Sequence, residues 1–307
     1  MQAVAERLRR GGLLLLDGGL STQLERAGAD LRDALWSARL LIDEPDAIRA
    51  AHRAFLDAGA DVVITASYQA SFEGFAARGL DATEAATLMR RSVSLARRAV
   101  EDVDRIGREP ALVAASVGPF GAVLADGSEY TGAYGRSVAE LTAFHERRLR
   151  VLWEAEPDLL AIETIPSLDE ARAVLIALSG VPDAVAWCSF TCRDGSTLAD
   201  GSPFEAAVAT VAAAPAILAI GVNCTHPGFV PELVRRAAAL TDRPIVAYPN
   251  RGARWDPAAR RWVGEANADL GEAARTWRAA GAGLIGGCCG TDAEDIAAIR
   301  RRLAERP

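Results

Sequence analysis

Residues 283–290 read Gly-Leu-Ile-Gly-Gly-Cys-Cys-Gly, a short apolar run followed by a glycine pair and two adjacent cysteines. Successive side chains of a regular strand point to opposite faces, so neighbouring thiols cannot face one point while the strand continues. Glycine adopts backbone dihedrals that other residues avoid, so the strand can break at Gly286 and Gly287. Both sulfurs can then turn toward a single centre. We predict a buried strand whose carboxyl end presents two thiols.

Seven further apolar runs share this composition, and each is followed by an amphipathic segment. The runs are rich in Val, Ile and Leu and do not alternate with polar residues, which is typical of strands buried on both faces. The eight predicted strands are Leu13–Gly19, Asp61–Ser67, Ala111–Gly118, Leu159–Thr164, Ala184–Thr191, Ala216–Cys224, Pro244–Pro249 and Gly283–Cys288. The eight predicted helices are Pro45–Ala58, Ala82–Val103, Ser137–Ala155, Ser167–Leu178, Pro203–Val211, Pro231–Leu240, Glu265–Ala280 and Asp292–Arg302.

Eight strand-then-helix units predict an α/β fold, a single (β/α)8 TIM barrel with parallel strands, as one domain over residues 1–307. A doubly wound open sheet is the rival, but no Gly-x-Gly-x-x-Gly turn follows an early strand. No linker rich in Pro, Ser or Gly divides the chain. Ala125–Gly135 and Asp194–Ser202 are predicted to be long loops on the catalytic face, and Trp255–Trp262 a turn or short hairpin.

Composition excludes several classes of function. All 34 basic residues are arginine, so chemistry that needs a lysine amine is excluded. A net charge of −7 gives no electrostatic footprint for nucleic acid. No apolar run is long enough to span a membrane, and Leu13–Leu16 is too short for a signal peptide, so we expect a cytoplasmic protein. Five cysteines, an odd number, favour reduced thiols over a disulfide framework. The oligomeric state stays unknown.

Three local patterns give further predictions. Ser167 and Glu170 have the spacing of a capping box at a helix start. The arginine-rich stretch Arg147–Arg150 is predicted to be an exposed helix face. Cys188 and Cys192 lie four residues apart, on the same side of one strand, and are predicted to be buried rather than redox-active.

The active site of such a barrel lies at the carboxyl ends of its strands. In this chain those ends carry two acids, two asparagines, several hydroxyls and three candidate thiolates. The polar strand ends of any barrel could supply the oxygens, but they do not explain three cysteines, which usually prefer burial.

Cys224, Cys288 and Cys289 are predicted to bind Zn²⁺. Strands six and eight are second neighbours, roughly 10 Å apart, and zinc–sulfur bonds of about 2.3 Å plus side-chain reach can bridge that distance. Three protein ligands leave the fourth position open, as in catalytic zinc sites. Three thiolates reduce the Lewis acidity of the ion, and such a centre suits an exogenous thiol kept as a thiolate. Buried cysteines or a redox pair remain the alternatives.

Four motifs carry a resemblance to a known family: Asp-Gly-Gly at 17–19, Gly-Val-Asn-Cys at 221–224, Tyr-Pro-Asn at 248–250 and Gly-Gly-Cys-Cys at 286–289. In this order, across nearly the whole chain, they resemble the homocysteine S-methyltransferase family. The resemblance implies a zinc-dependent barrel that transfers a methyl group to the thiol of L-homocysteine, giving methionine. It places the zinc on the same three cysteines.

The same resemblance implies roles for the other strand ends. Asp17 and Glu163 would anchor the ammonium group of the substrate through charge-assisted hydrogen bonds. Backbone amides near Gly18 and Gly19 would approach its carboxylate, and Asn250 sits where some relatives offer a fourth metal ligand. No side chain is expected to be catalytic itself, because the zinc-activated substrate thiolate is the nucleophile. The predicted substrate-binding set is Asp17, Gly18, Gly19, Thr65, Ser116, Glu163, Asn223 and Asn250.

Departures from the family motifs bear on the methyl donor. Gly290 stands where relatives that use sulfonium donors often carry arginine, and Arg251 replaces a serine. Thr164 stands where betaine-dependent relatives carry a tyrosine. Folate-dependent relatives need a second barrel and betaine-dependent ones a C-terminal extension, and neither fits in 307 residues. The compact members that use S-methylmethionine are therefore the best match, with S-adenosylmethionine as a lesser donor.

The expected partners are two small molecules, L-homocysteine and a sulfonium donor. A thiolate would attack the sulfonium methyl in line, and the donor would leave as a neutral thioether, so no general acid is needed. An aromatic ring could face the donor cation, although ordinary packing is the simpler role for each candidate. The candidates are Tyr68, Phe120, Tyr130 and Trp255.

Several alternatives remain open. The barrel could use betaine or another donor, or a selenol or other thiol as acceptor. A zinc hydrolase or lyase is disfavoured, because no histidine or carboxylate falls among the candidate ligands. A redox-sensing protein without metal would instead join Cys224 to the Cys288-Cys289 pair by a disulfide.

Overall fold

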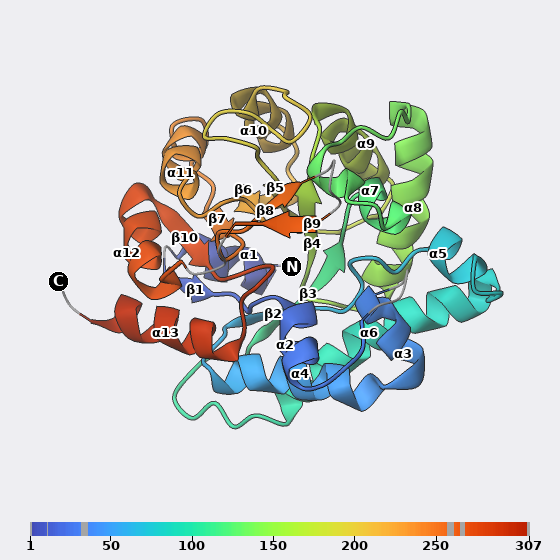
Figure 1. The fold of residues 1–307 in the computed structure, drawn as a ribbon, viewed down its shortest axis with the longest axis horizontal. Helices are drawn as coiled ribbons and strands as arrows, with labels where there is room; N and C mark the ends of the chain where they lie inside the picture. The colour runs from blue at the N-terminus through green and yellow to red at the C-terminus, as the bar shows by residue number, and fades with distance from the viewer. Residues whose placement is uncertain (1, 11, 32–35, 257–260, 265–267, 306–307) are drawn as a thin grey trace.

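The computed structural model, which describes residues 2–10, 12–31, 36–256, 261–264 and 268–305, contains a nearly closed barrel of eight parallel strands (Figure 1). The order around the barrel is β1-β10-β7-β6-β5-β4-β3-β2, and a parallel bridge between Leu16 and Val62 links the two ends of this sheet. The predicted TIM barrel is confirmed. Its strands are β1 (Leu14–Leu15), β2 (Val62–Ile64), β3 (Leu112–Val117), β4 (Leu159–Ile165), β5 (Ala186–Phe190), β6 (Ile217–Asn223), β7 (Ile245–Tyr248) and β10 (Ala282–Ile285).

Helices surround the barrel, and each of the eight predicted helices is present (Figure 1). They are α4 (Pro45–Asp57), α6 (Ala82–Glu101), α8 (Val138–Glu154), α9 (Leu168–Ser179), α10 (Phe204–Ala212), α11 (Val230–Ala238), α12 (Leu270–Ala280) and α13 (Ala293–Ala304). The start predicted for α12, residues 265–267, lies outside the described residues. Shorter helices that the sequence pattern did not predict are α1 (Gln2–Arg9), α2 (Leu20–Arg26), η1 (Trp36–Arg39), α3 (Leu40–Asp43), α5 (Phe72–Ala76), α7 (Phe120–Leu124) and η2 (Ser128–Tyr130). In the described residues no helix is long and apolar enough to cross a membrane.

The strands are buried on both faces, as their composition predicts. Every residue of β3, β4 and β5 is buried. One set of alternate side chains fills the barrel interior, where Trp187 and Tyr248 are the largest, and the other set packs under the helices. The indole nitrogen of Trp187 donates to the Tyr248 hydroxyl over 3.1 Å, so the polar atoms of this interior pair are satisfied.

Gly286 and Gly287 are required for close packing rather than for unusual backbone dihedrals. Strand β10 ends at Ile285, and Gly286 and Gly287 have ordinary negative φ angles. A Cβ on Gly286 would lie 2.6 Å from the Cβ of Leu16, and one on Gly287 would collide with Thr291. The two glycines therefore let the end of β10 press against β1 and the following loop, which brings the cysteines over the barrel.

Two local predictions were wrong. Arg148, within a stretch predicted to be an exposed helix face, is fully buried and donates to backbone carbonyls. Ser167 does cap α9 by accepting from the Glu170 amide over 3.1 Å. The Glu170 carboxylate does not return to Ser167, because it is buried and bonded to Phe120 N and to His145. In both cases the side chain forms hydrogen bonds with residues that are distant in the sequence, and the local sequence pattern does not show these partners.

The predicted hairpin is confirmed where the structure describes it. Strand β8 (Arg254–Asp256) pairs antiparallel with β9 (Arg261–Val263), and residues 257–260 between them lie outside the described part. Cys188 and Cys192 are both buried, as predicted. The loop predicted at Asp194–Ser202 is held by Asp194, which accepts from the amides of Ser196 and Thr197.

Candidate metal and substrate site

A cavity of about 380 Å³ opens at the carboxyl ends of the barrel strands. Five of the eight predicted substrate-binding residues line it, at the ends of β1, β2, β3 and β4, and so do all three predicted metal ligands, which follow β6 and β10. The predicted residues that line this cavity are Gly18, Gly19, Thr65, Ser116, Glu163, Cys224, Cys288 and Cys289. A volume of this size is within the range of small-molecule sites.

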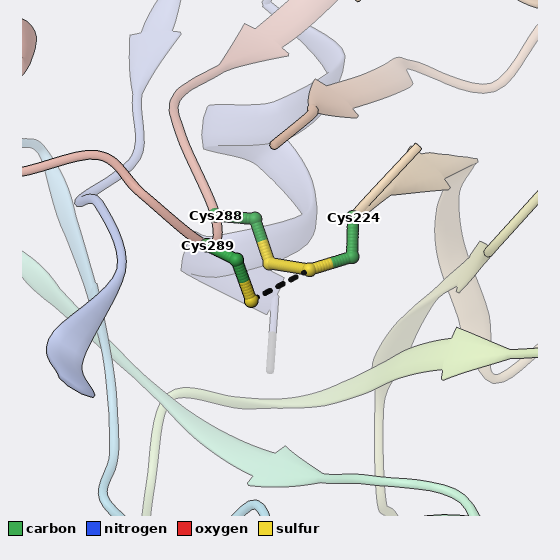
Figure 2. Close-up of side chains that lie close together, drawn as sticks. All are labelled: Cys224, Cys288 and Cys289. Atoms are coloured by element: carbon green, nitrogen blue, oxygen red, sulfur yellow. Dashed lines mark hydrogen bonds between the residues drawn. A yellow bond between two sulfur atoms is a disulfide. The ribbon is translucent and has the colours of Figure 1, made fainter. Parts of the chain in front are cut away.

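The three predicted metal ligands come together at this mouth (Figure 2). Cys224 follows β6, and Cys288 and Cys289 follow β10. Their sulfur atoms all lie within 4.8 Å of one another. Cys224 and Cys288 are joined by a disulfide, and the Cys289 Sγ lies 3.3 Å from the Cys224 Sγ. Figure 2 shows all three side chains pointing to one place from the two strand ends.

The backbone around Cys224 adopts an uncommon conformation. Cys224 has a φ of 45°, and Thr164, near the end of β4, has a φ of 60°. Non-glycine residues rarely adopt such left-handed dihedrals, which persist where surrounding contacts impose them. Asn223 supplies those contacts: its Oδ1 accepts from Thr164 N over 2.7 Å, and its Nδ2 donates to Thr164 Oγ1 over 2.7 Å. The turn aims the Cys224 thiol at the mouth.

The reduced cluster fits a metal ion. Three thiols that share one centre are the donor set that soft or borderline cations such as Zn²⁺ prefer. The Asn223 Nδ2 lies 3.9 Å from Cys288 Sγ, and the Tyr130 hydroxyl lies 3.7 Å from Cys289 Sγ, so polar groups orient the sulfurs from outside. Because a disulfide removes two of the three thiolates, metal binding requires the reduced state.

Glu163 lies on the cavity wall within a hydrogen-bonded group. The Ser116 hydroxyl donates to its Oε1, and the Tyr248 hydroxyl donates to its Oε2 over 3.0 Å. Burial raises the pKa of Glu163 to about 7, although the two hydroxyls lower it. The carboxyl group is therefore close to balanced between its charged and neutral forms at neutral pH, and a bound cation would favour the charge.

Asp17 is buried behind the cavity wall. Its Oδ2 accepts from Ile64 N over 2.7 Å, and its Oδ1 has no partner among the described residues. Burial raises the pKa of Asp17, and the charge of Glu163 raises it further. Two carboxyl groups that destabilise each other's charge favour a cation between them.

The remaining predicted residues divide into two groups. Thr65 lines the cavity, and its Oγ1 accepts from Ser116 N over 3.0 Å. The Gly19 amide already donates to the Thr291 carbonyl and hydroxyl, both at 3.0 Å. Asn223 and Asn250 do not line the cavity; Asn250 instead donates to the Cys224 carbonyl over 3.4 Å and accepts from the Gly252 amide. Both asparagines lie where they support the cysteine turn.

The sequence interpretation missed several polar side chains at or beside the site, three of which take part in its hydrogen bonding or charge. Gln69 lines the cavity, Tyr248 bonds to Glu163, and Glu129 is buried beside Tyr130. Tyr248 belonged to the Tyr-Pro-Asn motif and could have been found there. Glu129 lies in the loop predicted on the catalytic face, where a lone acid gave no sign of its burial.

The chain is similar to known proteins over nearly its whole length. The model of the homocysteine S-methyltransferase family matches residues 14–303. Homocysteine S-methyltransferase YbgG of Bacillus subtilis is 46% identical over 293 residues, which cover 94% of this chain and 93% of that protein. Selenocysteine Se-methyltransferase of Brassica oleracea is 43% identical over 312 residues, which cover 96% of this chain and 90% of that protein.

Solved structures agree. The homocysteine methyltransferase MmuM of Escherichia coli, in a metallated form, has a TM-score of 0.86 at 44% identity, covering 94% of this chain and 96% of that one. Its oxidized form gives the same values. A family match over almost the whole chain and relatives above 40% identity leave one conclusion. The chain belongs to the homocysteine S-methyltransferase family of enzymes.

Proposed function

We propose that the chain, as one domain, transfers a methyl group from S-methylmethionine to the thiol of L-homocysteine, giving two molecules of methionine. The observation that carries the proposal is the meeting of three cysteine sulfurs within 4.8 Å on the wall of a cavity that Glu163 also lines. Homocysteine is named for relatives at 46% identity. We expect the activity in the cytoplasm, where thiols stay reduced.

Cys224, Cys288 and Cys289 would hold a zinc ion in the reduced protein. When bound there, zinc would supply positive charge that keeps the homocysteine sulfur deprotonated at neutral pH. The E. coli relative with a metallated form supports a metal in this family. The protein would hold the three sulfur atoms near one point. The two hydrogen bonds between the Asn223 side chain and Thr164 support this arrangement at the end of β6.

Glu163 and Asp17 would bind the homocysteine ammonium group. Glu163 lies on the wall, and Asp17 Oδ1 has no partner among the described residues, so an ammonium group could satisfy both. Fixing this end of the substrate orients its thiol toward the cysteine cluster. Alignment of the two reacting sulfurs is expected to supply much of the rate.

The methyl transfer itself needs no acid or base from the protein. The electron pair of the homocysteine thiolate forms the new carbon–sulfur bond while the donor's methyl–sulfur bond breaks. The pair from the broken bond stays on the donor sulfur, which becomes a neutral thioether. The thiol proton has already passed to solvent, so charge and atoms balance.

The test is a paired assay on freshly reduced protein. Bound zinc is measured first, and methionine formation from homocysteine is then followed with S-methylmethionine, S-adenosylmethionine, betaine and methyltetrahydrofolate in parallel. One zinc per chain with turnover from S-methylmethionine is the expected result. Zinc with turnover from another donor alone would replace the donor, and zinc with no turnover would discard the substrate assignment.

A second candidate concerns the acceptor. The selenocysteine Se-methyltransferase relative, at 43% identity, favours a selenol as an alternative to the homocysteine thiol. Selenols ionise more readily than thiols and would depend less on the metal. Parallel assays with homocysteine and selenocysteine separate the two acceptors, and a higher kcat/KM for selenocysteine would reverse the preference.

A third candidate is a redox sensor, which the Cys224–Cys288 disulfide favours. It predicts protein that lacks zinc even after complete reduction. Zinc binding after treatment with a phosphine reductant would instead make the disulfide the oxidised, inactive form of the methyltransferase.

A further inference from the structure

Each of the three clustered sulfur atoms lies near a side chain that can donate a hydrogen bond. The Tyr130 hydroxyl lies 3.7 Å from Cys289 Sγ and 3.9 Å from Cys224 Sγ. The Asn223 Nδ2 lies 3.9 Å from Cys288 Sγ. A cysteine that binds a metal has lost its thiol proton, so in the loaded site the hydroxyl and the amide would be the donors. The protein therefore places a donor beside every sulfur that it contributes.

The cysteine cluster raises a question of selectivity. All three cysteines line the cavity, and Cys288 and Cys289 are partly exposed. A reactive methyl group that reaches a substrate thiolate there also comes within reach of the protein's own thiolates. A hydrogen bond to a thiolate stabilises its charge and makes it less basic, and a less basic thiolate is a weaker nucleophile. Protein sulfurs that accept hydrogen bonds should therefore react more slowly than a substrate sulfur without such a partner.

Tyr130 reaches the cluster from residues 119–135, here called the β3 loop, which follows β3 and contains α7 and η2. The two ends of this loop adjoin each other, because the rings of Phe120 and Tyr134 lie 5.5 Å apart. Inside the loop, α7 packs so closely on η2 that a Cβ on Gly121 would lie 2.5 Å from a backbone nitrogen of η2. The β3 loop is thus compact, and the place of Tyr130 depends on what holds the loop ends.

Glu170, on α9, holds both ends of the β3 loop. Its Oε1 accepts from Phe120 N over 2.6 Å and lies 2.9 Å from His145 Nε2. Its Oε2 accepts from the Tyr134 hydroxyl. Glu170 is fully buried, so water does not replace a hydrogen bond that is lost there. One side chain therefore fixes the beginning and the end of the segment that carries Tyr130.

Resting on the proposed function, we propose that the Tyr130 hydroxyl protects the protein's own cysteines from methylation, and that Glu170 is the positioning residue that keeps the hydroxyl in place. In the loaded site the hydroxyl donates to the two sulfurs nearest to it, and Asn223 does the same for the third. The methyl group is thereby directed to the substrate sulfur.

The reaction that the hydroxyl opposes is the alkylation of a cysteine. The electron pair of the cysteine thiolate forms a bond to the methyl carbon, while the bond from that carbon to its leaving group breaks and its pair stays on the leaving group. The product is a thioether without negative charge, whereas zinc sites are built from thiolates. Each such event would therefore damage the metal site.

The test uses reduced, zinc-loaded protein and iodomethane, a methylating agent that needs no binding site and releases iodide. Zinc content is measured first, and methylation of each cysteine is then followed by mass spectrometry of peptides, without homocysteine. We expect Tyr130→Phe to be methylated at Cys289 or Cys224 about tenfold faster than the unsubstituted protein, with unchanged zinc content. The rate at Cys288, which Asn223 contacts, should change much less.

The positioning role has a separate readout. Tyr134→Phe removes one hydrogen bond to Glu170 and should raise the same methylation rate, although by less than Tyr130→Phe does. Combining the two substitutions should give no further increase over Tyr130→Phe, because Tyr134 acts through the Tyr130 hydroxyl.

Glu170 itself gives a matched pair of variants. Glu170→Ala should raise the methylation rate as Tyr134→Phe does, and Glu170→Gln should largely restore it. Burial raises the pKa of Glu170 to about 8, so a neutral amide replaces a mostly neutral carboxyl group. Glu146→Gln is the control, because Glu146 lies on the exposed side of α8, pairs with Arg150 and should leave the rate unchanged.

Two results would overturn the inference. Equal methylation rates in Tyr130→Phe and the unsubstituted protein would show that the hydroxyl protects nothing. A further increase in the double variant would show that Tyr134 and Glu170 act on packing and not through Tyr130. If thermal unfolding shows that Tyr130→Phe does not fold, the rate in Tyr134→Phe decides, and an unchanged rate there counts against the inference.

Failure of the proposed function is a distinct outcome. A zinc-loaded enzyme that does not use S-methylmethionine would lose its assigned donor, while the iodomethane rates would still decide the role of Tyr130. Absence of zinc from the fully reduced protein would remove both proposals.

Discussion

Cys289 is the one cysteine of the cluster outside the disulfide, yet its Sγ lies 3.3 Å from Cys224 Sγ. Burial raises the pKa of its thiol to about 11, and the charges of Glu129 and Glu163 oppose the thiolate, although Tyr130 favours it. An isolated thiol of this kind would stay protonated at neutral pH. Only a bound cation would make it a thiolate, as expected of a metal ligand.

Cys289→Ala should therefore abolish zinc binding. Loss of one of three protein ligands is expected to reduce zinc in the reduced protein from about one per chain to almost none. Cys192→Ala is the matched control, because Cys192 is buried outside the cluster and should retain the metal. Elemental analysis after reduction measures both. Full zinc content in Cys289→Ala would remove it from the ligand set.

Glu163 should make the binding of an ammonium group depend on pH. Its folded pKa of about 7 lies above the ordinary value of 4.5, so an ammonium ligand binds better once pH rises and the carboxyl ionises. L-methionine, the proposed product, reports this without a titrating thiol. Its affinity should rise about tenfold through pH 7 and level off above it.

Glu163→Gln should flatten this pH dependence and weaken L-methionine binding, while zinc content stays unchanged. Rising pH has the opposite effect on the free energy of unfolding. Because the folded state holds the Glu163 proton more tightly, the unsubstituted protein loses stability as pH rises from about 4.5 to about 7 relative to the variant. Urea unfolding at several pH values measures this difference. A constant difference across that range would contradict the raised pKa.

Helix α8 holds two loops of the cavity wall in place through one buried side chain. Arg148 is fully buried and donates to the carbonyls of Ala70, Gly118 and Tyr68 over 2.9, 2.9 and 3.0 Å. Burial lowers its pKa to about 10, so the guanidinium remains charged at neutral pH. One cation thus fixes the loops after β2 and β3, and Tyr68 lines the cavity.

Arg148→Lys should lower the free energy of unfolding by about 2–4 kcal/mol, because an ammonium cannot reach carbonyls that a planar guanidinium spans. We also expect a raised KM for the methyl donor, since Tyr68 loses its anchor. Arg150→Lys on the same helix is the control: Arg150 is exposed and pairs with Glu146, so its change should stay within about 0.5 kcal/mol. Equal effects of the two substitutions would show that Arg148 holds nothing in place.

Sequence patterns predict some of these elements well and others not at all. The eight strands and eight long helices have enough residues for an apolar period to emerge, and all were predicted. Helices α7 and η2 have five and three residues, too few for any period, although η2 contains Glu129 and α7 packs against it. Arg148 was assigned to the surface because arginine usually is exposed, and only tertiary structure brings its carbonyl partners together.

The residues of the candidate site were also predicted only in part. The cysteines were predicted to meet because motifs at strand ends converge in any parallel barrel, and the structure brings them within 4.8 Å. Asn223 and Asn250 were placed in the substrate set for the same reason, yet neither lines the cavity. Position at a strand end does not reveal which way a side chain turns. The backbone φ of 45° at Cys224 has no sequence signal.

At the scale of the whole molecule, Asp61 ties together the beginning, middle and end of the chain. It precedes β2 and accepts from Leu15 N over 3.0 Å, from Arg105 over 2.7 Å and from Arg108 over 2.6 Å. Arg300 on α13 reaches it over 3.3 Å. These contacts close the barrel floor, opposite the active site, across the same seam that the Leu16–Val62 bridge links.

Asp61→Asn should lower the free energy of unfolding by about 3 kcal/mol at pH 7, because breaking a buried ion pair leaves arginines uncompensated. Burial raises the pKa of Asp61, but together the Leu15 amide and the Arg108 and Arg300 charges lower it by more, so its folded pKa lies below the ordinary value. The stabilisation is therefore present above about pH 4, the ordinary value for an aspartate, and is lost as pH falls below it.

Urea unfolding at pH 7 and near pH 3 measures the gap between Asp61→Asn and the unsubstituted chain, which should shrink at the lower pH. Asp57→Asn is the control, since Asp57 is exposed and pairs with Arg53 over 3.6 Å, and an exposed ion pair contributes little to stability. Activity per folded molecule should be unchanged in Asp61→Asn, because the floor and the cysteine cluster occupy opposite ends of the barrel. A stability gap that stays constant with pH would mean that Asp61 acts through its shape and hydrogen bonds, and that its charge does not hold the seam.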